Sequence, residues 1–231
     1  MVALPFASNP SLYKQMRYDP QRDFTPISMV TSTALVLCVH PSVPAKNTAE
    51  LIGLAKKNPG DLHFPSAGNG SSMHLAGELF AMMAGIRTVH VPYKGSAPGV
   101  IDLVSGRLHF MFNPMPEPLP FIKAGKLRAL ASTTQNRVSA LPELPPVAQA
   151  VPGYEVLTWH GVVAPVGTPA PVIGRLHSEI IKALRTPDFA ARLISLGLEI
   201  QGNTPEQFAQ FIKDETVKWA KVIKATGATV D

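Results

Sequence analysis

Short apolar segments alternate with helix-like segments through residues 33–132, and this alternation constrains the fold more than any other feature of the sequence. The run TALVLCVH ends at Pro41 and has the length and valine content of a buried strand. A helix is expected next at NTAELIGLAKKNPG, where Asn47 can cap and Glu50 can complete a capping box. Further strands are expected at DLHFPSA, RTVHVPY, RLHFMF and KLRALAS. Repeated strand–helix–strand units predict an α/β fold with a layered sheet.

The C-terminal part of the chain contains helices that share one start signal. Thr is placed to cap, with Pro at the first helical position, in TPAPVIGRL, TPDFAARL and TPEQFAQF. In the last of these, Thr204 and Gln207 add a capping box, and a short strand is expected before it at LEIQG. The final helix carries an apolar face that we interpret as core rather than a cofactor site, formed by Phe208, Phe211, Ile212, Trp219, Val222 and Ile223.

Composition excludes several classes of protein. The basic residues are dispersed rather than clustered, so no nucleic-acid partner is expected. The net charge of +5 suits an acidic small molecule, although ordinary soluble proteins carry similar charges. Cys38 is the only cysteine, so no internal disulfide and no CxxC metal site can form. Apolar runs are too short for a membrane helix, and MVALPFA does not read as a signal peptide, so we expect a chain that neither spans a membrane nor carries an export signal.

A Gly-rich loop precedes one predicted helix in SAGNGSSMHLAGELF, residues 66–80. A phosphate-binding P-loop requires a Lys directly after its second Gly, but Ser71 follows Gly70 here. A dinucleotide-binding loop requires a small residue at the position of Met73. Both nucleotide-binding motifs are therefore excluded. Two interpretations stay open. The loop is either a turn with a helix cap, or an anion site where Gly68 and Gly70 expose backbone amides and the Ser71 and Ser72 hydroxyls add hydrogen bonds.

A second loop of the same kind occurs in VPYKGSAPG, between a predicted strand and helix. Ser96 is expected to cap that helix. Strand-to-helix loops gather at one edge of an open α/β sheet, so we expect the two loops to converge. Lys94 would then attract an acid, or would be an ordinary solvated lysine.

The sequence contains no recognisable catalytic arrangement. Ser lies in no GxSxG elbow, and neither a Cys–His pair nor a carboxylate pair is evident. His74 lies in the first turn of its helix, where the dipole disfavours a cation, so we expect a neutral, structural side chain. The remaining candidate ligands lack metal-site spacing: His63, His90, His109 and His160. We therefore predict no enzyme, no catalytic residue, no metal and no cofactor.

Five segments, in order and with intact spacing, resemble one known family. They are NPSLYKQMRYDPQRDFTPISMV, SAGNGSSMHLAGELF, HVPYKGSAPGVIDLVSGRLHFMF, AGKLRALAST and WHGVVAPVGTPAPVIGRL. Over residues 9–231 the chain resembles the Bug, or TctC-like, receptors, the extracytoplasmic solute-binding receptors of tripartite tricarboxylate transporters.

The resemblance implies a two-lobed periplasmic binding protein of type II, or Venus-flytrap, architecture. Lobe 1 would comprise residues 1–43 plus 158–231, and lobe 2 residues 44–157. A small di- or tricarboxylate would be held near helix N-termini, and the membrane subunits of the transporter would be partners in the periplasm. Alternatives are a ligand-sensing module for a sensor protein, or a truncated remnant that binds nothing. The ligand-binding candidates are Ser66, Gly68, Asn69, Gly70, Ser71, Ser72, Tyr93, Lys94, Gly95 and Asn113.

Two departures from the family pattern bear on function. By comparison with the family pattern we expect the first strand, Gly-rich loop and helix of lobe 1 to be missing, and apolar surface to be exposed there as a result. The next loop reads ALPFAS where relatives have small Ser and Thr residues. Asn113 stands where relatives usually have Asp after the dipeptide MF, which favours a fully acidic ligand without an amine.

Overall fold

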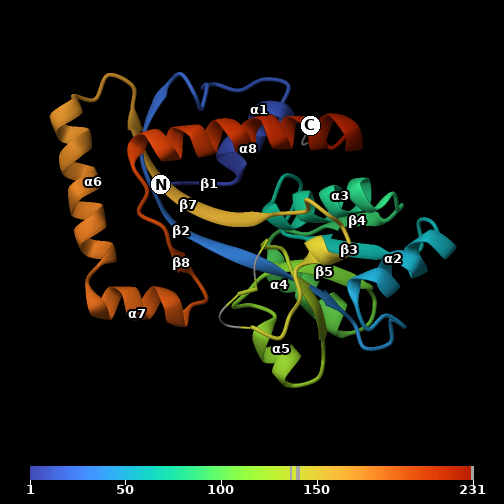
Figure 1. Cartoon of the computed structure of the whole chain (residues 1–231). Coiled ribbons are helices and arrows are strands. Elements are labelled where there is room, and N and C mark those ends of the chain that lie inside the picture. Colours follow the sequence, from blue (N-terminus) through green and yellow to red (C-terminus); the bar gives the residue numbers. More distant parts are fainter. Residues whose placement is uncertain (136, 139–140, 230–231) are drawn as a thin grey trace. The chain divides into compact units, whose positions relative to one another are not determined.

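The computed structural model describes residues 1–135, 137–138 and 141–229 (Figure 1). The chain forms two compact units, Met1–Thr33 with Thr158–Asp231, and Ala34–Leu157. The division falls within two strands, β2 (Phe24–Val39) and β7 (Leu157–Pro165), so both strands contribute residues to both units. The assignment of residues 1–43 plus 158–231 and of 44–157 to two lobes stays a prediction.

The unit Ala34–Leu157 combines parallel and antiparallel strand pairs. Strands β3 (His63–Ser66) and β4 (Val89–Pro92) are parallel, with Ser66 opposite Pro92. The second half of β2 pairs antiparallel with β5 (Phe110–Pro114) and β6 (Arg128–Ser132). The helices of this unit are α2 (Thr48–Lys57), α3 (Ser72–Ala84), α4 (Ser96–Val104) and α5 (Leu119–Lys123), with a 3₁₀ turn at Val147–Gln149.

Aromatic rings fill the core of this unit. Phe80 packs edge-on against Phe112 and Tyr154, and the buried Tyr154 hydroxyl donates to the carbonyl of Ala76 at 2.9 Å. Helix α3 approaches β3 closely because Gly77 has no side chain, and a Cβ there would overlap the ring of Phe64. Both strand-to-helix loops of the β3–β4 pair are therefore held on a closely packed framework.

The other unit contains β1 (Val2–Ala3), α1 (Pro5–Leu12), α6 (Ala170–Leu184), α7 (Pro187–Ser195), β8 (Glu199–Ile200) and α8 (Pro205–Thr226). Strand β1 pairs antiparallel with β7, and β8 with the first half of β2. Helix α1 lies against α8 (Figure 1). The ring of Trp159 meets Phe208 and Phe211 edge-on, which confirms the interpretation of the α8 face as core. The segment ALPFAS, expected as a loop, instead enters α1.

The observed N-caps of the helices agree only in part with those predicted from the sequence. Asn47 caps α2 and accepts the backbone N–H of Glu50, and Thr204 caps α8 in a full capping box, as predicted. The expectation for TPAPVIGRL was wrong, because Pro169 is the N-cap of α6 and the Thr168 hydroxyl bonds to the carbonyl of Pro165. The expectation for Ser96 was also wrong by one residue, since Gly95 is the N-cap of α4.

Candidate functional site

The loops that follow β3 and β4 lie side by side, as the strand-to-helix pattern predicted. The backbone N–H of Tyr93 donates to the carbonyl of Ser66 at 3.1 Å, and that of Gly95 donates to the carbonyl of Ala67 at 3.3 Å. Because β3 and β4 are parallel, both loops leave the same edge of the pair, and the N-termini of α3 and α4 follow directly.

Hydrogen bonds within the Gly-rich loop give it a defined shape. The Ser66 hydroxyl accepts the N–H of Gly68 at 3.1 Å, while the hydroxyl and N–H of Ser71 donate to the carbonyl of Gly68 at 2.8 and 3.2 Å. Gly68 has a φ of 123°, and a Cβ there would lie 3.3 Å from the carbonyl oxygen of Tyr93. The close approach of the two loops therefore requires a glycine at this position.

The far end of the loop is tied to a histidine of α3. The N–H of Gly70 donates to Nδ1 of His74 at 3.0 Å, and Ser71 caps the helix by accepting the N–H of His74 at 3.3 Å. His74 is 4% exposed, and burial lowers its pKa to about 4. The side chain is therefore neutral near pH 7, which confirms the prediction of a neutral, structural histidine.

A second ring from β4 covers the first. The imidazole of His90 stacks on that of His74 with centroids 3.9 Å apart, and its Nε2 lies 2.6 Å from the Ser66 hydroxyl. Burial, together with the neighbouring His74, lowers the pKa of His90 to about 3. The carboxylate of Glu78 lies 3.7 Å from Nε2 of His74, and burial raises the pKa of Glu78.

The backbone amides that the anion-site interpretation assigned to a ligand already form hydrogen bonds within the protein. The N–H groups of Gly68, Gly70 and Gly95 all donate to protein acceptors. Asn69 and Lys94 are exposed at the surface of the two loops, and Ser71 and Ser72 are half-buried at the start of α3. The first four residues of α3 and of α4, 72–75 and 96–99, include no acidic residue. The partial positive charges of two adjacent helix N-termini are thus not offset by carboxylates in their first turns.

Tyr93 is anchored away from its loop by two residues of α4 and its C-terminal turn. Its hydroxyl donates to Oδ2 of Asp102 at 2.6 Å, while Arg107 donates to Oδ1 of Asp102 at 2.9 Å. This hydrogen bond raises the pKa of Tyr93 to about 12 and lowers the pKa of Asp102. The Tyr93 hydroxyl therefore donates its proton to Asp102, and its oxygen can only accept hydrogen bonds from other groups.

Asn113 differs from the loop residues because its side chain lacks partners. It lies on β5 opposite Val36, it is fully buried, and neither Oδ1 nor Nδ2 has a hydrogen-bond partner among the described residues. A buried amide without partners costs free energy, which makes this position a candidate for contact with a polar ligand or a water.

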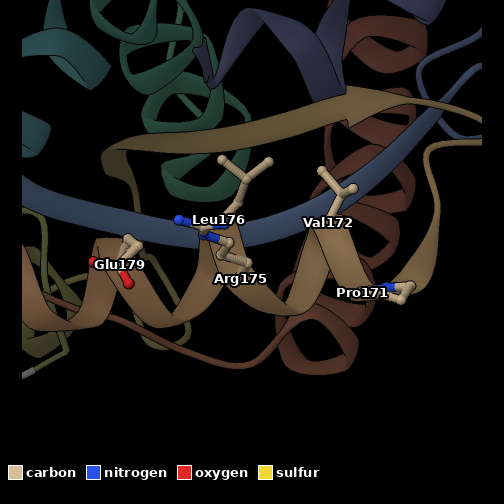
Figure 2. A pocket seen from close by; sticks show the side chains of 5 residues that line it. All are labelled: Pro171, Val172, Arg175, Leu176 and Glu179. Carbon is tan, nitrogen blue, oxygen red and sulfur yellow. The ribbon is translucent and has the colours of Figure 1, made fainter.

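A separate hollow of about 440 Å³ lies along α6 (Figure 2). All its lining residues belong to that one helix: Pro171, Val172, Arg175, Leu176 and Glu179. The side chains of Val172 and Leu176 point to the same side (Figure 2), and Glu179 pairs with Lys182 at 2.9 Å. Arg175 and Glu179 bring opposite charges to this hollow, so it offers an acid no net positive charge and is a poorer match than the two loops.

Residues 1–135, 137–138 and 141–229 include no group of three or more His, Cys, Asp or Glu side chains arranged to hold a metal ion. They also form no helix with the length and apolar character needed to cross a bilayer.

The sequence profile of the tripartite tricarboxylate transporter family receptor (TctC) matches residues 1–228. The chain belongs to this receptor family. It is 42% identical over 213 residues to the "UPF0065 protein in tcbD-tcbE intergenic region" of Pseudomonas sp. (strain P51), a match that covers 91% of this chain and 63% of that protein. It is 35% identical over 225 residues to "Protein BugT" of Bordetella pertussis, covering 97% of this chain and 69% of BugT. The receptor chain described here thus spans about two thirds of the length of these relatives.

Solved structures confirm the fold. "R. palustris Rpa4515 with adipate" matches with a TM-score of 0.87 and 36% identity, over 99% of this chain and 77% of that one. "MatC (Rpa3494) from Rhodopseudomonas palustris with bound malate" matches with a TM-score of 0.83 and 26% identity, over 96% and 77%. The predicted α/β fold of the periplasmic binding-protein type is therefore confirmed. Membership of a receptor family likewise agrees with the prediction that the chain is not an enzyme. The expected lack of the first strand, loop and helix of lobe 1 stays a prediction.

The sequence predicted both loops but not the side-chain hydrogen bonds that hold them in place. The Ser66–His90 hydrogen bond depends on the β3–β4 register, which no local pattern specifies. The Gly70–His74 hydrogen bond is local, four residues apart, but it depends on the turn conformation of the loop and on the rotamer of His74. The Tyr93–Asp102 bond had a usable signal, because the loop residue and the helix residue are only nine positions apart. The assignment of the ten candidate residues as ligand contacts stays a prediction.

Proposed function

We propose that this chain is a solute receptor for a small carboxylate, in particular an acid with two carboxylates. The observation that carries the proposal is the match to the Rpa4515 structure with adipate, at 36% identity over 99% of this chain. The MatC structure with bound malate supports the same chemical class at lower identity.

The two loops supply the chemistry that the proposal needs. A carboxylate beside the N-termini of α3 and α4 would interact favourably with both helix dipoles. The exposed ammonium of Lys94 would add attraction at the same place. We assign the contacts to Asn69 and Lys94, which are exposed, and to Ser72 at the start of α3. We assign a shaping role to Ser66, Gly68, Gly70, Ser71, Tyr93 and Gly95, whose polar groups are largely bonded within the protein.

Asn113 would tune the choice of ligand. Its neutral amide can donate to a carboxylate, whereas an aspartate at this position would repel an acid and attract an ammonium group. The buried amide that lacks partners supports such a contact. We therefore propose a ligand without an amine.

The family supports a proposal for the transporter and for the location. The family description, a receptor of tripartite tricarboxylate transporters, supports delivery of the acid to transporter membrane subunits. Solved relatives include a periplasmic binding protein, BugD, at 33% identity, which supports a periplasmic site of action.

The test is a calorimetric and thermal-shift titration of the purified chain with adipate, malate, citrate and glutamate. At a concentration 100 times its Kd, a ligand should raise the free energy of unfolding by about 2.7 kcal/mol. We expect a response to adipate or malate and a weaker one to glutamate, which carries an amine. Lys94→Gln should weaken binding about fivefold, while Lys126→Gln, an exposed lysine after α5, should not. Absence of binding by all four acids would contradict the proposal.

A further inference from the structure

The contact between Gly70 and His74 fixes the protonation state of the ring. The Gly70 N–H is a donor, so Nδ1 of His74, at 3.0 Å, must accept. The ring is therefore neutral, with its proton on Nε2, which faces the Glu78 carboxylate at 3.7 Å. A proton added at Nδ1 would bring two donors together and remove the acceptor for Gly70.

His90 holds the other end of the same loop. The Ser66 hydroxyl lies 2.6 Å from Nε2 of His90 and 3.0 Å from the carbonyl of Gly68, which also receives the N–H and the hydroxyl proton of Ser71. The shorter of the two contacts links His90 to the loop at Ser66. The ring of His90 stacks on that of His74. The stacked pair thus contacts the loop at Ser66 and at Gly70, on both sides of the exposed Asn69.

We propose that His74 is a positioning residue, whose neutral ring holds the Gly70 amide and so keeps residues 66–71 in the conformation that presents Asn69 and Ser72 to a ligand. Protonation of the ring then releases the loop. The identity of that ligand rests on the proposed function, whereas the positioning of the loop does not.

Few titratable groups surround the His74 ring, so the proposed pH dependence of the loop is assigned to His74. The titratable groups that face it are Glu78 on its own helix and His90 on β4. His63, the titratable residue of β3, packs edge-on against His109 instead. Strand β5, which packs on α3, carries no titratable side chain in residues 110–114. Burial lowers the pKa of His74 to about 4, so the neutral ring accepts the Gly70 N–H at neutral pH and loses this hydrogen bond when it is protonated in acid.

Two substitutions separate hydrogen bonding from packing. His74→Phe keeps a buried ring that can stack on His90 but removes the acceptor. His74→Asn keeps an acceptor oxygen near the position of Nδ1 but removes most of the ring. If the hydrogen bond positions the loop, asparagine preserves it and phenylalanine does not; if packing matters instead, the order is reversed. His109→Phe is a matched control, because His109 also accepts a backbone N–H at 3.0 Å, that of His63, away from the loop.

The experiment is amide hydrogen exchange of residues 66–75 in the full chain without ligand at pH 7. We expect roughly fivefold or greater acceleration at Gly70 in His74→Phe, less than about twofold in His74→Asn, and no change in His109→Phe. In the wild type, exchange corrected for its intrinsic pH dependence should accelerate as the pH falls towards 4. A loop in His74→Phe that exchanges like the wild type, or faster exchange in His74→Asn than in His74→Phe, overturns the proposal.

Two further measurements keep the test decisive. Adipate affinity should fall about fivefold in His74→Phe and stay unchanged in His109→Phe. If the wild type binds no adipate, the proposed ligand class fails while the exchange data still decide the positioning role. If His74→Phe does not fold, ¹⁵N spectra of the wild-type histidine rings replace it: an accepting Nδ1 on His74 at pH 7 supports the proposal, and a protonated Nδ1 overturns it.

Discussion

The hydroxyl of Tyr93 donates a 2.6 Å hydrogen bond to Asp102, and this bond ties the loop after β4 to the helix that the loop begins. Arg107 holds the other carboxylate oxygen of Asp102 at 2.9 Å. The three side chains therefore fix the direction in which the loop leaves β4, and with it the position of Lys94.

Removal of the carboxylate should be visible in the titration of the tyrosine. Asp102→Asn removes the carboxylate whose hydrogen bond and charge, together with burial, raise the pKa of Tyr93 to about 12, so that pKa should fall towards 10. Arg107→Gln should act in the opposite direction, because Arg107 lowers the pKa of Tyr93. Ultraviolet titration at the tyrosinate band, compared between the two variants, checks the sign. A pKa that does not change in Asp102→Asn would contradict the structure.

The contact between α3 and β3 should not tolerate a methyl group. Gly77→Ala places a Cβ into the ring of Phe64, and overpacking of this kind costs about 1–3 kcal/mol in the free energy of unfolding. Gly53→Ala is the matched control, because that position in α2 has open space and alanine favours a helix by about 0.5–1 kcal/mol.

Urea unfolding followed by far-ultraviolet circular dichroism measures both glycine variants. Tryptophan fluorescence would be the wrong probe, because Trp159 and Trp219 lie in the other unit. Equal stability changes in Gly77→Ala and Gly53→Ala would show that Gly77 does not set the helix–strand distance.

The sequence predicted those parts of the fold that local rules govern. Strands β3 to β6 are short apolar runs bounded by Pro or Gly, and each lies where the pattern placed it. Strand β2 begins at Phe24, nine residues before the predicted start. The prediction missed this part because Thr25, Ser28 and Thr31 interrupt its apolar residues, so no continuous apolar run forms there. Thr31, Ser32 and Thr33 are buried there, and partners far away in the chain satisfy them: His160, Gln201 and Gly197. Hydropathy alone cannot identify a buried strand whose polar groups find such distant partners.

In the candidate site, too, local sequence patterns predicted the loops but not the partners of their polar groups. Glycines and serines before a helix predicted the loop, and the strand–helix order predicted that a second loop would lie beside it. The partners of the Gly68 and Gly70 amides could not be predicted, because they depend on the turn conformation of the loop and on the side-chain orientations of Ser66 and His74. His74 was expected to be neutral from its place in the helix dipole, but its contact with Gly70 follows only from the three-dimensional arrangement.

The helix caps offer a graded test in the other unit. Thr204→Ala should lower the free energy of unfolding by about 1 kcal/mol, because the Thr204 side chain accepts the N–H of Gln207. Thr186→Ala should cost less than half as much, since the Thr186 hydroxyl donates to the carbonyl of Lys182 and does not cap α7. Tryptophan fluorescence reports this unit, and Trp219 lies on α8 itself. Equal losses in the two variants would contradict the assignment of the caps.

The buried histidine pair should make stability depend on pH. In the unfolded chain a histidine binds a proton near pH 6.5, whereas the folded chain keeps the pKa of His74 near 4 and that of His90 near 3. Below pH 6.5 the unfolded state therefore binds more protons, and the free energy of unfolding falls as the pH drops towards 4. The loss should be on the order of 2 kcal/mol for each ring between pH 7 and 4.5.

Urea unfolding of the wild type and of His74→Asn at both pH values compares proteins with and without this ring. Most carboxylates and histidines are common to both proteins and largely cancel in the difference, whereas His90, whose pKa is lowered mainly by burial and also by His74, adds a smaller change. His74→Asn should lose roughly 2 kcal/mol less than the wild type on acidification, even if it is less stable at pH 7. An identical loss in both proteins would mean that His74 titrates alike in the folded and unfolded chains. That outcome would contradict a ring held neutral by burial against His90 and Gly70.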